Sequence, residues 1–181
     1  DAKFDVADPD DRSAVTVGTL EVSDNSVRDA TQSGIYVEYY SELENYATSV
    51  FSRTLITSNT IEADGGDEGG IYIGYGVDSA DSSYDTRAEY GELLVMSNTI
   101  SASDGPGLML YYDDLGYDAG ENTLITVGAV NILSNTIDSY GDGIYIGYED
   151  VGYDMYGDAQ VLMGDQTIAG NDITSEDDGI Y

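Results

Sequence analysis

Residues 134–147 read SNTIDSYGDGIYIG, in which two short markers, Asn-x-Ile and Gly-Ile-Tyr, flank a gap rich in Gly and Asp. Both markers recur along the 181-residue chain. The Gly-Ile-Tyr marker begins at Gly34, Gly70, Gly143 and Gly179, and a degenerate Gly-Leu-Met copy begins at Gly107. The other marker, with Ile or Val at its third position, begins at Asn25, Asn59, Asn98, Asn135 and Asn171. Because the first marker advances by 36, 37, 36 and 36 residues, the chain is predicted to be a structural repeat.

Within each repeat the apolar residues follow a period of two, which is typical of β-strands. Ile144 and Ile146 share one face of a strand, and Tyr145 and Gly147 share the other. A second short strand is expected to carry the Asn marker, as in residues 56–61. A third is expected before it, at residues 47–51, 93–96, 124–127 and 160–163. Clusters of Gly, Asp and Ser between these segments supply the turns.

These features predict an all-β fold, a parallel β-helix (β-solenoid) of five coils of about 36 residues, with three short strands per coil. Division at the Tyr position gives one domain, 1–181, with coils 1–36, 37–72, 73–109, 110–145 and 146–181. Adjacent coils are expected ~4.8 Å apart. An internal ladder is expected from Ile35, Ile71, Leu108, Ile144 and Ile180. The five marker asparagines are expected to stack at one turn, each amide bonding to the next.

The repeat resembles that of a known superfamily. Ser-Asn-Thr-Ile, a Gly/Asp-rich gap and Gly-Ile-Tyr-Ile look like the repeat of the right-handed parallel β-helix, or pectate-lyase-like, superfamily, and the resemblance covers all five coils. It implies the fold but leaves the function open. The superfamily includes polysaccharide lyases and hydrolases, phage tailspikes, adhesins, and archaeal or bacterial surface-layer and sheath proteins.

Charge and composition exclude several classes of function. The chain has 36 Asp and Glu against five Lys and Arg, a formal net charge of -31, so it repels nucleic acids and anionic membrane surfaces. No apolar run approaches the roughly 20 residues of a membrane-spanning helix. The absence of Cys and His removes disulfides, thiolate and imidazole metal sites, and catalysis by Ser-His-Asp or Cys-His groups. We therefore expect neither a nucleic-acid partner nor membrane insertion.

Catalysis is also not expected. Glycosidase chemistry needs two carboxylates, and Asp113-Asp114 is the best adjacent pair. Similar pairs occur at residues 10–11, 67–68, 149–150 and 177–178, so adjacency singles out none of them. The resembled hydrolases usually add a His and basic residues, and the lyases use a basic proton abstractor. Here no basic residue follows Arg87.

Acidic residues recur at two positions of the repeat, just before and just after the Gly-Ile-Tyr strand. Like charges one coil apart repel unless a cation intervenes or the side chains splay into water. Since Ca²⁺ prefers carboxylate and carbonyl oxygens, Ca²⁺ is the expected bound ion. The candidate ligands are Asp67, Glu68, Asp104, Asp113, Asp114, Asp142, Glu149, Asp150 and Asp178; Glu44 and Asp81 lie in the same columns. A solvated acidic surface adapted to high salt is an equal alternative, because no dedicated calcium motif is present.

Tyrosines form two further columns. Tyr36, Tyr72, Tyr145 and Tyr181 are expected on the outer face. Tyr39, Tyr75, Tyr112 and Tyr148 fall on the inward phase, and we expect them at a bend. Such columns can bind sugars, but packing or assembly is the favoured interpretation because nearly every coil carries a copy.

The sequence ends within a Gly-Ile-Tyr strand and contains no predicted cap, so it is interpreted either as a fragment of a longer solenoid or as a unit that stacks head to tail. The expected function is that of a self-assembling structural protein of an extracellular filament, sheath or surface layer. Its expected partner is a homopolymer, and the resemblance together with the acidity indicates an archaeal source. The alternatives are a Ca²⁺-dependent adhesin or carbohydrate-binding solenoid at the cell surface, with polysaccharide as partner, and a polysaccharide lyase or hydrolase.

Overall fold

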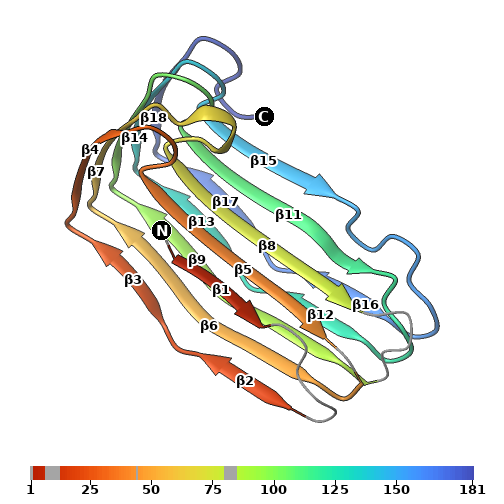
Figure 1. Cartoon of the computed structure of the whole chain (residues 1–181). Helices are drawn as coiled ribbons and strands as arrows, with labels where there is room; N and C mark the ends of the chain where they lie inside the picture. Colours follow the sequence, from red (N-terminus) through yellow and green to blue (C-terminus); the bar gives the residue numbers. More distant parts are fainter. Residues whose placement is uncertain (1, 7–12, 44, 80–84) are drawn as a thin grey trace.

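The computed structural model describes residues 2–6, 13–43, 45–79 and 85–181. These residues form an all-β parallel solenoid, as predicted, in which the chain winds repeatedly through three sheets (Figure 1). Apart from the single 3₁₀ turn η1 (Gly66–Glu68), the regular structure in the described part is β-strand.

Each sheet collects strands from successive coils, and in sheet B a coil contributes either one long strand or two short ones. Sheet A contains the Gly-Ile-Tyr strands β1 (Ala2–Val6), β5 (Ile35–Leu43), β8 (Ile71–Ser79), β11 (Leu108–Tyr117) and β15 (Ile144–Glu149). Sheet B contains β2 (Ala14–Val17), β3 (Leu20–Ser23), β6 (Thr48–Thr57), β9 (Arg87–Met96), β12 (Leu124–Val127), β13 (Val130–Leu133), β16 (Gln160–Met163) and β17 (Gln166–Ala169). Sheet C contains β4 (Ser26–Ala30), β7 (Thr60–Ala63), β10 (Thr99–Ala102), β14 (Thr136–Ser139) and β18 (Asp172–Ser175).

The sequence period sets the strand register. Ile71 pairs with Ile35 on one side and with Leu108 on the other, and Leu108 in turn pairs with Ile144. An isolated bridge then joins Ile144 to Ile180. The predicted internal ladder is therefore present, although Ile180 remains exposed at the edge of the stack.

The predicted strand 56–61 is wrong in one respect, because it breaks at the marker asparagine. β6 ends at Thr57 and β7 begins at Thr60. The residue before each marker asparagine has a positive φ: Asp24, Ser58, Ser97 and Ser134 lie between 54° and 57°, and Gly170 has 67°. This left-handed residue turns the chain from sheet B to sheet C. The asparagines themselves stack at that turn, as predicted.

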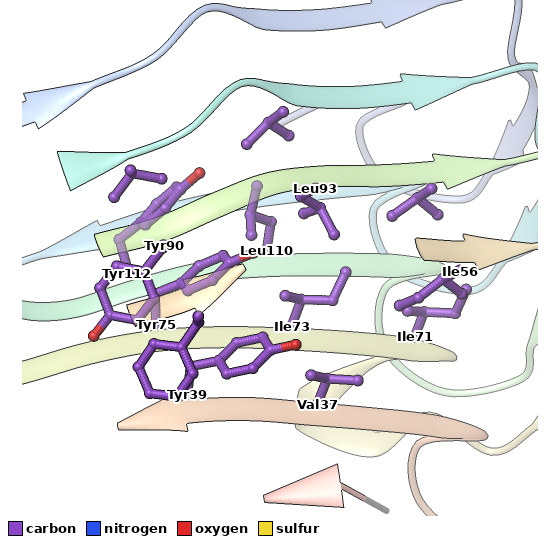
Figure 2. Packing of buried hydrophobic residues seen from close by; sticks show 14 of the residues in the cluster. Val37, Tyr39, Ile56, Ile71, Ile73, Tyr75, Tyr90, Leu93, Leu110 and Tyr112 are labelled. Atoms are coloured by element: carbon purple, nitrogen blue, oxygen red, sulfur yellow. The ribbon is translucent and has the colours of Figure 1, made fainter. Parts of the chain in front are cut away.

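The interior is an apolar core with an aromatic column along the solenoid axis. The ring centroids of Tyr39 and Tyr75 lie 5.5 Å apart, and those of Tyr75 and Tyr112 lie 5.6 Å apart. Phe4 and Tyr148 extend the column at 5.2 and 5.0 Å. Figure 2 shows the rings of Tyr39, Tyr75 and Tyr112 gathered beside aliphatic core residues such as Val37 and Ile73.

The expected bend at this tyrosine column is a wrong prediction. Buried and partly exposed residues alternate along β5 without interruption, so Tyr39 simply points inward. Two of the buried phenol groups are accommodated by hydrogen bonds, whereas the buried Tyr112 hydroxyl has no hydrogen-bond partner among the described residues. The Tyr39 and Thr54 hydroxyls lie 2.6 Å apart, and the Tyr90 hydroxyl donates to the carbonyl oxygen of Gly76 at 2.7 Å.

Glycines in sheet B allow the coils to approach closely. A Cβ added to Gly91 would collide with the carbonyl oxygen of Ser52, and one added to Gly128 would lie 2.7 Å from the carbonyl carbon of Gly91. A Cβ added to Gly164 would likewise lie 2.7 Å from the carbonyl carbon of Gly128. The spacing of Gly91, Gly128 and Gly164 by 37 and 36 residues is a sequence signal for this column, which was not among the predicted features.

Candidate functional site

The nine predicted cation ligands fall into two groups along sheet A. Those of the first group lie in the turns that connect sheet C to sheet A: Asp67, Glu68, Asp104, Asp142 and Asp178. Those of the second group lie further along the sheet A strands: Asp113 and Asp114 lie within β11, Glu149 is the last residue of β15, and Asp150 follows it. Asp10-Asp11, Glu44 and Asp81 fall outside the described residues.

The structure brings some of these carboxylates into contact with other groups. Ser33 donates to Glu68 at 3.4 Å, the backbone N–H of Asp178 donates to Asp142 at 3.0 Å, and the Tyr111 hydroxyl donates to Glu149. Within the described residues, no group of three or more carboxylates is close enough to hold a metal ion. Ca²⁺ binding therefore remains a prediction.

Negative charge nevertheless accumulates around β11. Partial burial, followed by the neighbouring carboxylate of Asp114 and then that of Glu149, raises the pKa of Asp113. On the same outer face, burial raises the pKa of Tyr72 to about 12, with Glu38 and Glu68 as further causes. The smaller contributions of the neighbouring carboxylates to these pKa shifts indicate repulsion between negative groups, which a cation or high salt would relieve.

The outer tyrosines stack against one another along the axis. The centroids of Tyr36 and Tyr72 lie 4.8 Å apart with planes 13° apart, and those of Tyr145 and Tyr181 lie 5.1 Å apart with planes 5° apart. A Cβ added to Gly74 would lie 2.8 Å from the Tyr72 hydroxyl, so the ring lies along its own strand. Sugars stack on ring faces, and here the faces lie against each other. This geometry favours packing over sugar binding for the stacked pairs.

Met109 interrupts this column in the degenerate coil. Beside it lies a shallow groove of about 360 Å³ that Pro106, Met109 and Tyr145 line together with four carboxylates. The carboxylates are those of Asp67, Asp104, Asp142 and Asp177.

The two outer coils expose surfaces that the inner coils cover. We call the edge formed by residues 147–149 at the end of β15, by β16, β17 and β18, and by residues 179–181 the C-face, and the edge formed by β1, β2, β3 and β4 the N-face. On the C-face Tyr148 is 54% exposed, whereas Tyr112, one coil earlier, is 0% exposed. Ile180 likewise is 53% exposed, whereas Ile144 is 0% exposed. The C-face is thus the surface that one further coil of the same kind would cover.

The asparagine ladder gives this stack a direction. Asn59 donates from Nδ2 to Oδ1 of Asn98, Asn98 donates to Asn135, and Asn135 donates to Asn171, at 3.0, 3.0 and 2.9 Å. The backbone N–H of each donor residue bonds to the same Oδ1 atom. Continuation of this pattern places amide donors of Asn171 on the C-face and the acceptor Oδ1 of Asn25 on the N-face. The two faces are therefore complementary.

Comparison with protein-family models, curated proteins and solved structures gives no match to this chain. Among the described residues, no helix is long and apolar enough to cross a membrane.

Proposed function

We propose that this chain is a structural protein that self-assembles end to end into an extracellular filament, sheath or surface layer, like the surface-layer and sheath members of the superfamily that its repeat resembles. The observation that carries the proposal is the complementarity of the two faces: amide donors and exposed apolar side chains on the C-face, and amide acceptors and an apolar hollow on the N-face. An exposed strand edge of this kind pairs readily with the complementary edge of a second copy.

Complementary faces predict a head-to-tail polymer. Joining the C-face of one copy to the N-face of the next continues every sheet in register, whereas two C-faces would oppose donor to donor. Contacts of this heterologous kind build an open polymer or a ring. Charge opposes the contact, because the predicted coils 146–181 and 1–36 carry nine and eight acidic residues. Assembly is therefore expected to require salt or divalent cations such as Ca²⁺.

Disulfide trapping tests the proposal, because the chain has no native Cys. Ser26, Thr60, Thr99, Thr136 and Asp172 occupy one position of sheet C. A head-to-tail stack thus places Asp172 beside Ser26 of the next copy, ~4.8 Å away, within the usual Cα separation of disulfides.

Mixed Ser26→Cys and Asp172→Cys proteins should form a disulfide-linked heterodimer in salt or Ca²⁺, and negative-stain images should show polymers. Ser101→Cys, an exposed position of an inner coil, is the matched control and should not cross-link to Ser26→Cys. Absence of heterodimers and of polymers at every salt and Ca²⁺ concentration would overturn the proposal.

A second candidate function, binding of a cell-surface polysaccharide, is favoured by the groove beside Met109. There Met109 interrupts the tyrosine column, and the ring of Tyr145 lines the groove. Co-sedimentation with insoluble polysaccharides, with and without Ca²⁺, tests it. Tyr145→Ala should reduce binding, and an unchanged bound fraction would contradict this function.

A further inference from the structure

The outer face of sheet B carries apolar side chains, unlike the outer face of sheet C. The strands β6, β9, β12 and β13 lie side by side in sheet B (Figure 1). Buried and outward-pointing residues alternate along β12 and β13 and along both halves of β6 and β9. We call the outward-pointing residues of these four strands the B-face. Its partly exposed apolar side chains are Val50, Leu55, Leu94, Met96, Leu124 and Leu133. The outward positions of β7, β10 and β14 in sheet C hold only Ser, Thr, Glu and Asp.

Four of these apolar side chains form one continuous cluster. Leu55 pairs in register with Leu94, and Met96 pairs in register with Leu133. Leu94 and Met96 are two residues apart on β9, so they share a face and join the two pairs. A contiguous apolar patch on the surface is typical of a site of protein–protein contact.

The charges of the B-face cancel. Its charged residues are two Arg and two Glu. The Nε atom of Arg53 lies 3.0 Å from a carboxylate oxygen of Glu92, and Arg87 pairs with Glu89 on the same strand. By contrast, β5, β8, β11 and β15 of sheet A contain acidic residues and no Lys or Arg. Since the chain has a formal net charge of -31, a second copy approaches over the B-face at a lower electrostatic cost than over sheet A.

The outer face of sheet B is also large enough for a dimer. β6 and β9 have ten residues each. Ten residues extend over about 33 Å, and the five strands that lie side by side across the sheet span about 24 Å. This face therefore covers about 800 Å², the area that each partner contributes to an interface of standard size. The acidic Glu21 and Asp165 lie at its two margins, and a polar margin around an apolar centre is usual for such interfaces.

We infer that two copies of this chain pack against each other through their B-faces, sheet on sheet, about a two-fold axis parallel to β9. All B-face residues lie on the inner coils, so this contact is independent of the proposed end-to-end contact. It supplies the side-by-side joining of chains that a sheath or a surface layer needs in addition.

The position of the apolar cluster determines the direction of the axis. The cluster occupies the half of sheet B that leads to sheet C, whereas the paired charges occupy the middle and the other half. Rotation about an axis parallel to the strands keeps the strand direction, so the two apolar halves meet. Because β9 is the middle strand, it lies opposite β9 of the second copy, and Met96 lies opposite Met96.

Chemical cross-linking tests this contact, because the chain has no native Cys. Packed sheets are about 10 Å apart, so a bis-maleimide with a spacer of about that length should join two Met96→Cys chains. Ser101→Cys, on sheet C of the same coil, is the matched control and should not be joined. An end-to-end stack would place successive copies of Met96 about 24 Å apart, beyond the reach of the spacer. The reaction is run with EDTA in about 1 M NaCl, where the screening length is about 3 Å.

A charge placed in the apolar cluster provides a second measurement. In the Met96→Cys chain, Leu94→Glu should raise the protein concentration for half-maximal cross-linking by about tenfold or more, because burial of a Leu side chain contributes a free energy of that order. Ser101→Glu, which adds the same charge on sheet C, should change this concentration less than about threefold. Circular dichroism and thermal unfolding verify that both variants are folded.

The outcomes for the two contacts are distinguishable. If Met96→Cys is joined no more than Ser101→Cys at every salt concentration, or if Leu94→Glu and Ser101→Glu have equal effects, the B-face contact is wrong, whatever the Ser26–Asp172 pair shows. If Met96→Cys is joined while Ser26→Cys and Asp172→Cys fail to link, the B-face dimer stands and the end-to-end assembly is wrong. Leu94→Glu should leave the link between Ser26→Cys and Asp172→Cys intact.

Discussion

Replacement of the buried ladder residue Asn98 by Ala should destabilise the fold far more than the same change at the edge residue Asn25. Asn98 is 1% exposed, and its side chain makes four hydrogen bonds. Nδ2 donates to Ile56 O and to Asn135 Oδ1, and Oδ1 accepts from both the backbone N–H and Nδ2 of Asn59. Asn98→Ala removes all four bonds and leaves the Asn59 N–H buried without its acceptor.

The magnitude follows from these bonds. A net contribution of about 0.5–1.5 kcal/mol for each gives a loss of roughly 2–6 kcal/mol. This is a large part of a typical unfolding free energy of about 5–15 kcal/mol. The Asn25 amide donates to Ser23 O and to Asn59 Oδ1 at the exposed edge, where water can replace these bonds. Asn25→Ala should therefore cost no more than about 1 kcal/mol.

Urea unfolding at low protein concentration and low salt, where the chain is expected to be monomeric, measures both values. The m-value must stay constant between the variants for the comparison to hold. If Asn98→Ala and Asn25→Ala differ by less than about 0.5 kcal/mol, the ladder does not contribute as we have argued.

Three further predictions use other features of the solenoid. Gly91→Ala should lower the unfolding free energy by about 3 kcal/mol or more, because the added Cβ would collide with the Ser52 backbone. Gly18→Ala, with open space around the added Cβ, should change the unfolding free energy by less than about 0.5 kcal/mol. Thermal melts of the two variants measure this difference. The melting temperature should rise when the NaCl concentration is increased from about 10 mM to 1 M, because the screening length falls from about 30 to 3 Å. Ca²⁺ at matched ionic strength should raise the melting temperature further if the acidic columns bind the ion. Burial raises the pKa of Tyr72 to about 12. Because the pKa in the unfolded chain is about 10, the associated stability is present below that pH and is lost as the pH rises toward the folded value. Tyr72→Phe should shift alkaline unfolding to higher pH. Titrations followed by tyrosinate absorbance and circular dichroism measure this, and the same unfolding midpoint for the native chain and for Tyr72→Phe would contradict it.

The fold was predictable because each structural role is filled by the same residue type at a nearly constant spacing. Ile35, Ile71 and Leu108 identify the inner ladder from sequence alone, and Asn59 and Asn98 identify the stacked turn. A period of two places these residues on one face without any knowledge of tertiary contacts.

The remaining features depend on backbone conformation and side-chain geometry, which the spacing of residues does not specify. The break at Ser58 requires a left-handed backbone conformation at a non-glycine residue, and the residue type alone does not indicate that conformation. Alternation had placed Tyr39 inside, and the expectation of a bend overlooked that Thr54 could accommodate a buried phenol. Asp104 and Asp142 lie in the expected turns before the sheet A strands, whereas Asp113 and Asp114, expected after the strand, lie within β11. Whether neighbouring carboxylates converge depends on side-chain rotamers, which the period does not specify. For the same reason the donor direction of the asparagine ladder appears only in the structure.

The in-register pairing of each strand with its counterpart one coil away also determines how the molecule opens. Every strand pair of the three sheets joins neighbouring coils, so unfolding free energy accumulates coil by coil as nearest-neighbour terms. Such an array frays from its ends. Amide hydrogens of β16, β17 and β18 should exchange fastest, those of β8, β9 and β10 slowest, and polymerisation should erase this gradient by turning terminal coils into internal ones.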